Sequence, residues 1–235
     1  MKNESLVRPR PIRGLRREEV VCLPCDLPSG LIQRTLEKRC SVRKDLRFCR
    51  LYLLPKRAVL FGALGAPAAV LALEPLVASG TQRIIFLGFS GSLSDRFSIG
   101  DLVSVGAAFS DEGTSKHYPP KKRLFLPADE LKDRLEEMLS KRGIEFKTGK
   151  IVSTDAPYRE TPSWLKKSRN RGAELVDMET SAVFALAGFY GLHAVSLQIV
   201  SDELGSEGWR SDFWGKRLIA RVKTGFFPLI FNGQP

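Results

Sequence analysis

The chain has 235 residues and a formal net charge of +11, and 43% of its residues are hydrophobic and 27% charged. This is the composition of a globular protein, so a wholly disordered or collagen-like chain is excluded. Apolar runs stay shorter than the roughly 18 residues of a membrane span, and residues 1–19 lack the apolar segment of a secretory signal. We therefore expect a soluble, cytoplasmic protein with no membrane partner.

The pattern of apolar and polar residues predicts strands and helices that alternate along the chain. The predicted strands span residues 20–23, 48–54, 58–61, 83–87, 101–105, 146–153 and 194–200. The predicted helices span residues 28–44, 67–79, 131–142, 162–171, 179–190 and 213–224, the first with Ser29 as its N-cap. Such alternation indicates an α/β fold with a largely parallel sheet covered by helices on both faces. We expect a single domain over residues 18–235, preceded by an arm rich in Pro and Arg over residues 1–17.

Positive charge is concentrated near the start of the chain. Residues 1–57 hold 15 Lys and Arg against 6 Asp and Glu, whereas residues 58–235 hold 22 against 20. A clustered basic arm can bind phosphate backbones. Aromatic residues do not alternate with these arginines as a stacking surface would require, so a solvated arm is favoured and nucleic acid is the weaker alternative.

Cysteines and histidines give little support to a metal or redox site. Cys22 and Cys25 form a CxxC pair, which is compatible with zinc, with thiol redox chemistry or with structural thiols. Cys40 and Cys49 are not spaced as a second ligand pair, and Cys22 lies in an apolar run, so structural thiols are favoured. The chain has only two histidines, which excludes a metal cluster built from several histidines. We expect no metal and no cofactor.

Three predicted strands lead into turns that contain glycine or polar residues. These turns span residues 62–67 and 88–93 and the Ser201-Asp202 pair. Parallel α/β sheets form their binding sites at the carboxyl ends of the strands. The three turns therefore indicate the position of a candidate site.

Two carboxylates are the main candidates for chemistry at that site. Glu179 begins an apolar helix directly after Met178, where its two oxygens could accept hydrogen bonds from vicinal hydroxyls while the thioether packs on a sugar ring. Its simpler interpretation is favourable interaction with the helix dipole. Asp202 follows a hydrophobic strand, where partial desolvation would raise the pKa of a carboxyl and make it a general acid near neutral pH.

Four segments, in order and in spacing, resemble the nucleoside phosphorylase family. The family comprises purine nucleoside and uridine phosphorylases and shares its fold with the methylthioadenosine/S-adenosylhomocysteine nucleosidases. The segments are 62–67 (GALGAP), 84–93 with 100–103 (IIFLGFSGSL and GDLV), 153–158 (STDAPY), and 176–182 with 200–202 (VDMETSA and VSD). The resemblance covers roughly residues 55–205. It implies a three-layer α/β/α sandwich with a central mixed, mostly parallel sheet, and a homo-oligomer (dimer, trimer or hexamer).

The resemblance also implies a role for each matching residue. Glu179 would hold the ribose hydroxyls, Met178 would pack on the ribose, and Asp202 would protonate or hydrogen-bond N7 of a purine. Further residues would surround the base, namely Ser90, Gly91 and Tyr158. Phosphate, as a possible co-substrate, would lie beside Gly65.

The phosphate-binding residues of the family are not retained. Phe86 and Phe89 stand where phosphorylases carry Arg and Ser or Thr, and residues 25–28 (CDLP) reduce the family's phosphate turn. A phenyl ring cannot replace the bidentate anion contact of a guanidinium. Basic residues that could compensate, by reaching the site of a neighbouring subunit, are Arg43, Arg47 and Arg50.

These observations leave three functions open. The family default is phosphorolysis of the N-glycosidic bond of purine-type nucleosides. The alternatives are a phosphate-independent nucleosidase and a degenerate family member that binds a nucleoside without cleaving it.

Overall fold

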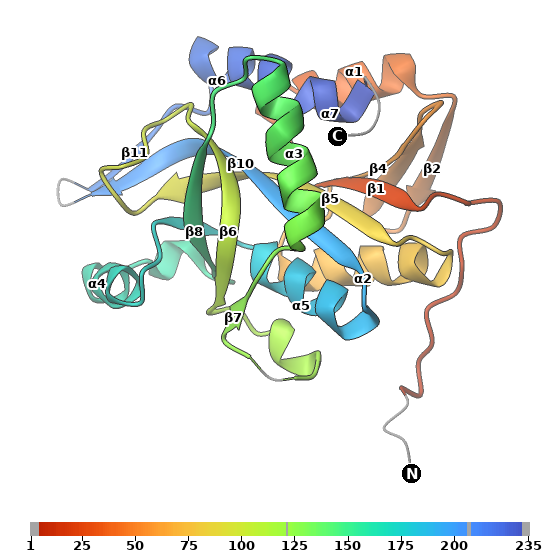
Figure 1. The fold of residues 1–235 in the computed structure, drawn as a ribbon, viewed down its shortest axis with the longest axis horizontal. Coiled ribbons are helices and arrows are strands. Elements are labelled where there is room, and N and C mark those ends of the chain that lie inside the picture. Colours follow the sequence, from red (N-terminus) through yellow and green to blue (C-terminus); the bar gives the residue numbers. More distant parts are fainter. Residues whose placement is uncertain (1–4, 121, 206–207, 232–235) are drawn as a thin grey trace.

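The computed structural model describes residues 5–120, 122–205 and 208–231 (Figure 1). Helices cover both faces of one central sheet. Helices α2 (Ala66–Ala78) and α5 (Thr180–Tyr190) lie on one face, and α1 (Leu31–Arg39), α3 (Asp129–Lys141) and the C-terminal helical segments lie on the other. The expected three-layer α/β/α fold is confirmed.

The strands of the described residues form one mixed sheet. In chain order they are β1 (Glu19–Leu23), β2 (Val42–Leu46), β3 (Cys49–Leu53), β4 (Ala58–Phe61), β5 (Arg83–Ser92), β6 (Leu102–Ser110), β7 (Leu124–Phe125), β8 (Lys147–Ser153), β9 (Leu175–Asp177), β10 (His193–Gly205) and β11 (Gly208–Ser211). The other helical segments are η1 (Ser115–His117), η2 (Pro157–Arg159), α4 (Pro162–Asn170), α6 (Lys216–Arg221), the π-helical η3 (Val222–Phe226) and α7 (Phe227–Phe231).

The central strands β4, β1, β5 and β10 run parallel to one another. At one end, β3 and β2 extend the sheet antiparallel. At the other, β10 pairs with both β5 and β6, and β6, β8 and β9 lead back to β5. These five strands therefore close into a ring, and the carboxyl ends of β5 and β10 lie next to each other.

Side chains of the central strands are buried on both faces. In β1, Val20 and Cys22 belong to the hydrophobic cluster shared with α2 and α5, whereas Val21 and Leu23 belong to the cluster shared with α1 and α3. Successive side chains of a strand point to opposite faces, so a strand covered on both sides is apolar throughout. This explains why residues 20–23 and 58–61 were recognisable as continuous apolar runs.

Two site strands are longer than predicted. Residues 88–92 continue β5 instead of forming a turn, and β10 runs past Asp202 to Gly205. A Cβ at Gly88 would lie 2.6 Å from Gln198 Oε1 across the strand pair, and a Cβ at Gly91 would lie 2.8 Å from Leu204 Cδ1. These glycines therefore permit close approach of neighbouring side chains, which is a role glycine has within strands.

The prediction for residues 28–44 is wrong at both ends. Helix α1 begins at Leu31, after Gly30 in the left-handed conformation, and Ser29 is not its cap. The carboxylate of Asp26 instead accepts hydrogen bonds from the first helical N–H groups, at 3.1 and 2.8 Å. Residues 42–46 form β2 because they pair with β3, a tertiary contact that overrides local helix propensity.

The described part of the arm, residues 5–17, has no helix or strand, yet its second half is attached to the domain. The backbone N–H of Ile12 donates to Ser79 Oγ at 2.8 Å, and Leu15 is buried in the core. The hydroxyl of Thr81 donates to the carbonyl of Arg17 at 3.1 Å. Residues 12–17 are therefore packed against the domain, whereas the sequence favoured a solvated arm.

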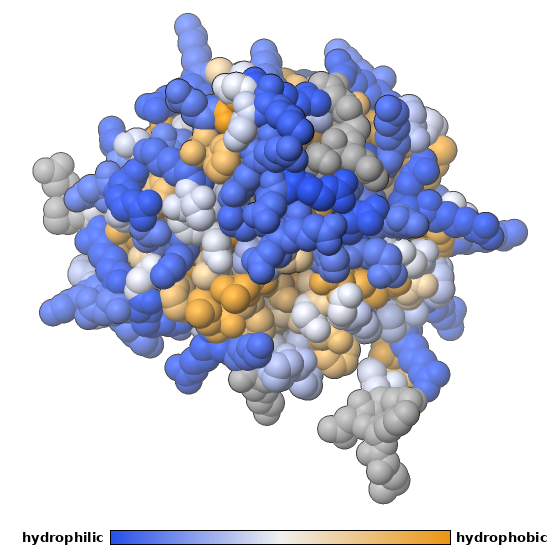
Figure 2. Space-filling view, in the orientation of Figure 1, coloured by the Kyte–Doolittle hydropathy of each residue, from blue (hydrophilic) through white to orange (hydrophobic). Residues whose placement is uncertain are grey.

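The surface is mostly hydrophilic, with an apolar area below the centre of the view in Figure 2, in the region of α5 and β7. Exposed hydrophobic side chains on these elements include Phe189, Tyr190 and Leu124. None of the helices in the described part of the chain combines the length and hydropathy of a membrane span.

Candidate active site

One cavity of about 450 Å³ lies where β5 and β10 end, beneath η2 and beside the N-terminus of α5. Its wall is mostly apolar, with carboxylates at several points. The lining residues are Pro24, Cys25, Leu64, Phe89, Ser90, Gly91, Pro157, Tyr158, Glu160, Val176, Asp177, Met178, Glu179, Ser201, Asp202, Leu204, Trp209 and Phe213. Six residues named from the sequence are thus brought together: Ser90, Gly91, Tyr158, Met178, Glu179 and Asp202.

A bulge in β10 positions Asp202. Val200 pairs with Ser90 of β5, but the next pair is Asp202 with Gly91, so Ser201 is an extra residue in the strand. Such bulges redirect side chains at sheet edges and next to active sites. Both carboxylate oxygens of Asp202 accept hydrogen bonds, Oδ1 from Ser201 Oγ at 2.6 Å and Oδ2 from Trp209 Nε1 at 2.8 Å.

Glu179 is the N-cap residue of α5, and its side chain is only 3% exposed. Its Oε1 accepts a hydrogen bond of 2.6 Å from the backbone N–H of Gly65, the N-cap residue of α2. Burial, reinforced by the negative charge of Asp177, raises the pKa of Glu179 to about 8. Its second oxygen, Oε2, accepts a hydrogen bond of 3.3 Å from the backbone N–H of Met178 and can accept a further one from a hydroxyl ligand.

A buried polar network holds the backbone around Glu179. Asp177 accepts a hydrogen bond from Ser153 Oγ at 2.6 Å, and from the N–H of Thr180 at 3.0 Å as well as from its hydroxyl. Gln198 Nε2 donates to Thr180 Oγ1 at 3.2 Å. Because every member lies on a different strand or on α5, the network fixes the start of α5 relative to the sheet.

The region expected to receive the base has an unsatisfied polar group. The hydroxyl of Ser90 is buried and has no hydrogen-bond partner within the described chain, although buried hydroxyls normally have one. Beside it, Gly91 has no side chain, and a Cβ at this position would lie only 3.0 Å from Asp202 Oδ2. Tyr158 stands at the rim and is fully exposed.

The residues expected to bind phosphate are not assembled at the cavity. The N–H of Gly65 donates to Glu179, and the three arginines Arg43, Arg47 and Arg50 lie on the β2–β3 hairpin and do not line the cavity. Arg43 and Arg50 pair with Asp45 at 3.0 and 3.5 Å. Within the described residues, no lysine or arginine lines this cavity.

Hydrophobic residues stand at the positions where the family resemblance led us to expect anion-binding groups. Phe86 is fully buried in the core, and Phe89 lines the cavity with its ring centroid 5.8 Å from that of Phe226. Cys25 lines the cavity as well, and burial, together with the charges of Glu179 and Asp26, raises the pKa of its thiol to about 12. The described lining of the cavity therefore offers an anion no positive side chain.

Sequence reasoning missed Glu160, Trp209, Phe213, Leu64 and Cys25 as cavity residues. Glu160 and Phe213 lie in connections between elements, and Trp209 enters through the β10–β11 hairpin. No local pattern marks these residues, because they reach the cavity only through tertiary packing. The one available signal was the continuation of a β-type pattern past Asp202, which would have placed Trp209 on the strand paired with the end of β10, opposite Leu204.

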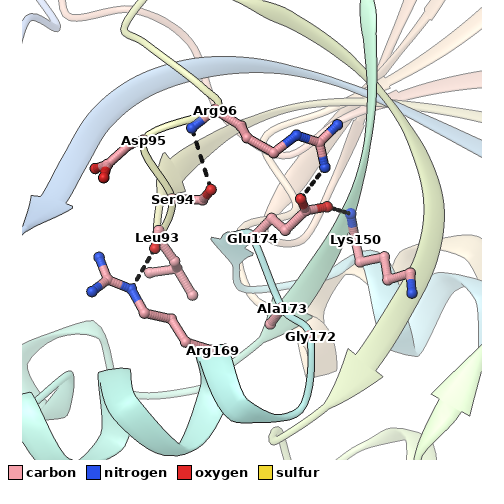
Figure 3. Close-up of a pocket in the computed structure, with 9 residues that line it drawn as sticks. All are labelled: Leu93, Ser94, Asp95, Arg96, Lys150, Arg169, Gly172, Ala173 and Glu174. Carbon is pink, nitrogen blue, oxygen red and sulfur yellow. Dashed lines mark hydrogen bonds and ion pairs between the residues drawn. The ribbon is translucent and has the colours of Figure 1, made fainter.

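A second cavity, of about 530 Å³, lies outside this site (Figure 3). It contains Arg96, Lys150 and Arg169, and both guanidinium groups already have partners. The guanidinium of Arg96 pairs with Glu174, and Arg169 Nε donates to the carbonyl of Leu93 at 2.5 Å. The arrangement is that of a braced surface loop.

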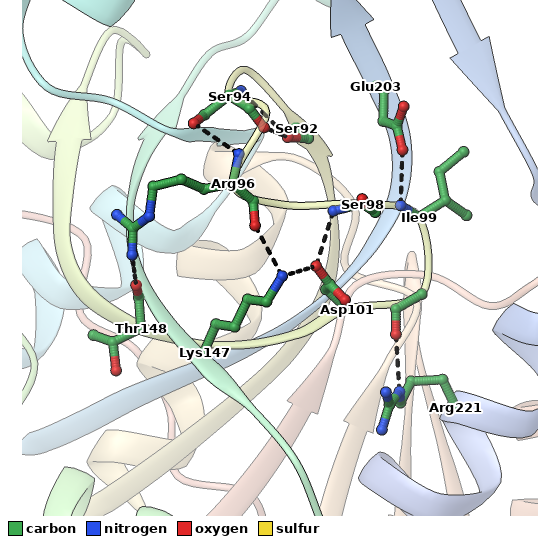
Figure 4. Close-up of polar contacts among 11 residues, drawn as sticks. Ser92, Ser94, Arg96, Ser98, Ile99, Asp101, Lys147, Thr148, Glu203 and Arg221 are labelled. Atoms are coloured by element: carbon green, nitrogen blue, oxygen red, sulfur yellow. Dashed lines mark hydrogen bonds and ion pairs between the residues drawn. The ribbon is translucent and has the colours of Figure 1, made fainter.

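The connection from β5 to β6 is braced from several elements (Figure 4). Lys147 Nζ of β8 contacts Asp101 Oδ2 at 2.7 Å, and the backbone N–H of Ile99 donates to Glu203 Oε1 of β10 at 2.9 Å. Arg221 of α6 donates to the carbonyl of Gly100 at 2.8 Å. These contacts hold the ends of β5 and β10 together and thereby fix the cavity wall.

The cysteines are free thiols, with Cys22 and Cys49 buried. Among the residues that the structure describes, no group of three or more His, Cys, Asp or Glu is arranged to hold a metal ion. Burial is the largest of the effects that raise the pKa of Cys22 far above its ordinary value. The arrangement is that of the structural thiols favoured from the sequence.

Comparison with known proteins gives concordant results. Guanosine phosphorylase from Halorubrum lacusprofundi is 30% identical over 141 residues, which are 60% of this chain and 58% of that protein. A purine nucleoside phosphorylase of the DeoD type from Bacillus cytotoxicus is 27% identical over 167 residues, which are 70% of this chain and 71% of that protein. The match thus spans less than two thirds of the first relative and more than two thirds of the second.

Solved structures share the whole fold at low sequence identity. Purine nucleoside phosphorylase from Toxoplasma gondii, in complex with immucillin-H, superimposes with a TM-score of 0.76 at 21% identity, covering 94% of this chain and 93% of the other. Campylobacter jejuni 5'-methylthioadenosine/S-adenosyl homocysteine nucleosidase gives 0.75 at 17% identity, covering 92% and 98%.

Structural similarity at such low sequence identity shows the fold and does not assign the chain to a family. A family model makes that assignment. The model of the phosphorylase superfamily matches residues 34–222, which include the cavity residues from Leu64 to Phe213. The resemblance seen in the sequence is therefore confirmed, and the chain belongs to the phosphorylase superfamily.

Proposed function

We propose that the protein cleaves the N-glycosidic bond of purine-type nucleosides. The observation that carries this proposal is the convergence of Glu179, Met178 and Asp202 on one cavity that also contains the unpartnered hydroxyl of Ser90. Family membership and the printed functions of the relatives, guanosine and purine nucleoside phosphorylase, agree with it. The activity is that of a nucleoside phosphorylase or nucleosidase.

In this proposal Glu179 binds the ribose hydroxyls, and Met178 packs on the sugar. Ser90, Gly91 and Tyr158 surround the base, with the Ser90 hydroxyl gaining a polar partner. Asp202 faces N7, where a hydrogen bond or proton makes the purine a better leaving group. As the C1′–N9 bond breaks, positive charge develops on the ribose, and buried carboxylates stabilise such charge.

The acceptor of the ribosyl group is phosphate or water. Phosphorolysis is the family default, and it requires a cation that the described cavity residues of this chain do not supply. The exposed arginines of the β2–β3 hairpin would have to reach the cavity of a neighbouring subunit. Hydrolysis is the second candidate, favoured by Phe89 and by the absence of lysine and arginine from the lining of the described cavity.

A homo-oligomer and a cytoplasmic location belong to the same proposal. Leu71 of α2 is 62% exposed, and Phe189 of α5 is 47% exposed, on helices that pack against each other. Exposed apolar side chains of this size favour burial against another copy of the chain. No metal or organic cofactor is proposed, and phosphate is at most a co-substrate.

A nucleoside panel with and without phosphate tests the proposal. Purified protein is incubated with adenosine, guanosine, inosine and uridine, and the free base is quantified by chromatography. Release of a purine base only with phosphate supports phosphorolysis, whereas equal release in phosphate-free buffer supports hydrolysis. Binding of a nucleoside without any release of base would refute cleavage and indicate a member of the superfamily that only binds its ligand.

A further inference from the structure

A cleft of about 390 Å³ adjoins the candidate active site. Three residues line both spaces, namely Glu160, Leu204 and Trp209. The cleft lies between α4 and the described part of the β10–β11 hairpin, which are at the same end of the molecule (Figure 1). Its volume is in the range of sites that bind small molecules, so it can receive one part of a ligand whose remainder lies in the cavity.

One face of α4 forms a wall of this cleft. The residues of α4 that line it are Pro162, Leu165, Lys166, Arg169 and Asn170. The first four follow a spacing of i, i+3, i+4 and i+7, which places side chains on one side of a helix. Lys166 is exposed and has no ion-pair partner among the described residues. The wall therefore combines apolar surface with an ammonium group that is free to bind an anion.

Arg169 adds positive charge at the boundary between the cleft and the cavity. Its Nη2 donates a hydrogen bond of 3.2 Å to the carbonyl of Leu204, a residue of both linings. A bond to a neutral carbonyl leaves the charge of the guanidinium in place. Glu160 is the only acidic side chain in the described lining of the cleft, whereas the described lining of the cavity has several carboxyl groups and no lysine or arginine. The cleft is thus basic and the cavity acidic.

The position of Asp202 indicates which part of a purine faces the cleft. In the proposed complex Asp202 faces N7, and the substituent at C6 of a purine lies beside N7 on the same edge of the ring. Trp209 Nε1 donates to Asp202 Oδ2 at 2.8 Å, so the indole contacts the carboxyl that faces this edge. Because Trp209 also lines the cleft, a long substituent at C6 would extend past the indole into the cleft.

We propose that the cleft binds an acidic substituent on the 6-amino group of the purine nucleoside. This inference rests on the proposed cleavage of nucleosides and names the class of substrate. Glu160, at the junction of the two spaces, accepts a hydrogen bond from the N–H of the substituted amino group. Leu165 and Trp209 pack on the carbon atoms of the substituent. Lys166 and Arg169 attract its carboxylate, because hydrogen bonds between ionised groups are stronger than neutral ones.

Three nucleosides with the same ribosyl-adenine core separate these contributions. Adenosine has no substituent, N6-benzyladenosine has an apolar one, and N6-(1,2-dicarboxyethyl)adenosine has an acidic one. Release of the base is measured by chromatography. Wild-type kcat/KM should be about tenfold higher for the acidic nucleoside than for adenosine, because binding of a remote group can lower the free energy of the transition state. N6-benzyladenosine should give an intermediate value.

Lys166 and Lys167 provide a matched pair of variants on α4. Both are exposed, but only Lys166 lines the cleft. In Lys166→Gln the ratio of KM for the acidic nucleoside to KM for adenosine should rise about fivefold, the effect of losing one exposed ion pair, and the change should appear in KM rather than in kcat. Lys166→Glu should raise the ratio further, and Lys167→Gln should leave it as in the wild type.

Salt gives an independent readout. Added NaCl should raise the KM of the wild type for the acidic nucleoside and leave that for N6-benzyladenosine nearly unchanged, because salt screens exposed ion pairs. This salt dependence should be weaker in Lys166→Gln. Circular dichroism and urea unfolding verify that each variant is folded.

Four results would overturn the inference. Wild-type protein that cleaves adenosine or inosine at least as well as the acidic nucleoside would refute the acidic substituent and leave nucleoside cleavage standing. Equal preference for N6-benzyladenosine would assign the cleft to apolar groups. Equal effects of Lys166→Gln and Lys167→Gln would show a general effect of charge on α4. Wild-type protein that cleaves none of these nucleosides would refute nucleoside cleavage itself, and this inference with it.

Discussion

Replacement of Glu179 by Gln should stabilise the folded protein at alkaline pH while it abolishes nucleoside cleavage. The carboxyl is buried, and its pKa is raised from 4.5 to about 8. A carboxyl with a raised pKa contributes stability that is present below pH 4.5 and is lost as pH rises through about 8. The amide of Gln has no charge to bury, so the variant should not show this loss.

The magnitude follows from the pKa difference. One pKa unit corresponds to about 1.4 kcal/mol, so the full shift sets an upper limit of about 5 kcal/mol. Asp177 shares part of that titration, and the amide forms a weaker hydrogen bond with the N–H of Gly65 than a carboxylate does. A net gain on the order of 3 kcal/mol at pH 9 is expected, against a difference near zero at pH 5.

Urea unfolding at pH 5, 7 and 9 measures the effect. The difference in the free energy of unfolding, Glu179→Gln minus wild type, should increase with pH, and Glu130→Gln on the exposed face of α3 serves as the control with no such trend. A difference that does not change with pH would refute the buried charge as its cause. If the wild-type protein gains stability relative to the variant toward pH 9, the predicted direction of the pH dependence is refuted.

Three further changes test the site and its support. Asp202→Asn should lower kcat/KM on inosine about 100-fold, measured by release of hypoxanthine, and full activity would refute its role at N7. Gly91→Ala should cost about 1–3 kcal/mol in thermal unfolding, because its Cβ would lie 2.8 Å from a leucine methyl group, whereas Gly188→Ala in open space should not. Arg57→Met should cost about 3 kcal/mol in urea unfolding, because buried Glu19 loses its ion pair of 3.2 Å and keeps only the contact of 3.5 Å with Arg83, and an unchanged midpoint would contradict this.

The secondary structure could be predicted from the sequence for elements whose side chains are completely buried. Residues 58–61 are a strand as predicted, because a central strand covered on both faces is apolar throughout. Helix α3 was predicted within two residues at each end from its amphipathic spacing. The prediction of a helix was wrong for residues 42–44, which belong to β2, a charged strand that forms only because β3 lies beside it.

Glycine was the main source of error at the site. Gly88 and Gly91 were interpreted as turn residues, because glycine is common where strands end. In the structure they are strand residues, and the side chains of Gln198 and Leu204 occupy the space that a Cβ would need. The sequence alone does not show which distant side chain lies against a glycine. A turn and a strand are therefore both compatible with the sequence around these glycines.

The sequence by itself determined the alternating α/β order, the family resemblance and the two carboxylates Glu179 and Asp202, because these depend on local spacing. Only the tertiary structure decided the surroundings of those carboxylates. It placed Trp209 and Ser201 on Asp202, brought Glu160 beside it, and left the cavity lining of the described residues without lysine or arginine. Protonation depends on burial and on neighbouring charge, and both arise from contacts between segments that are distant in the chain.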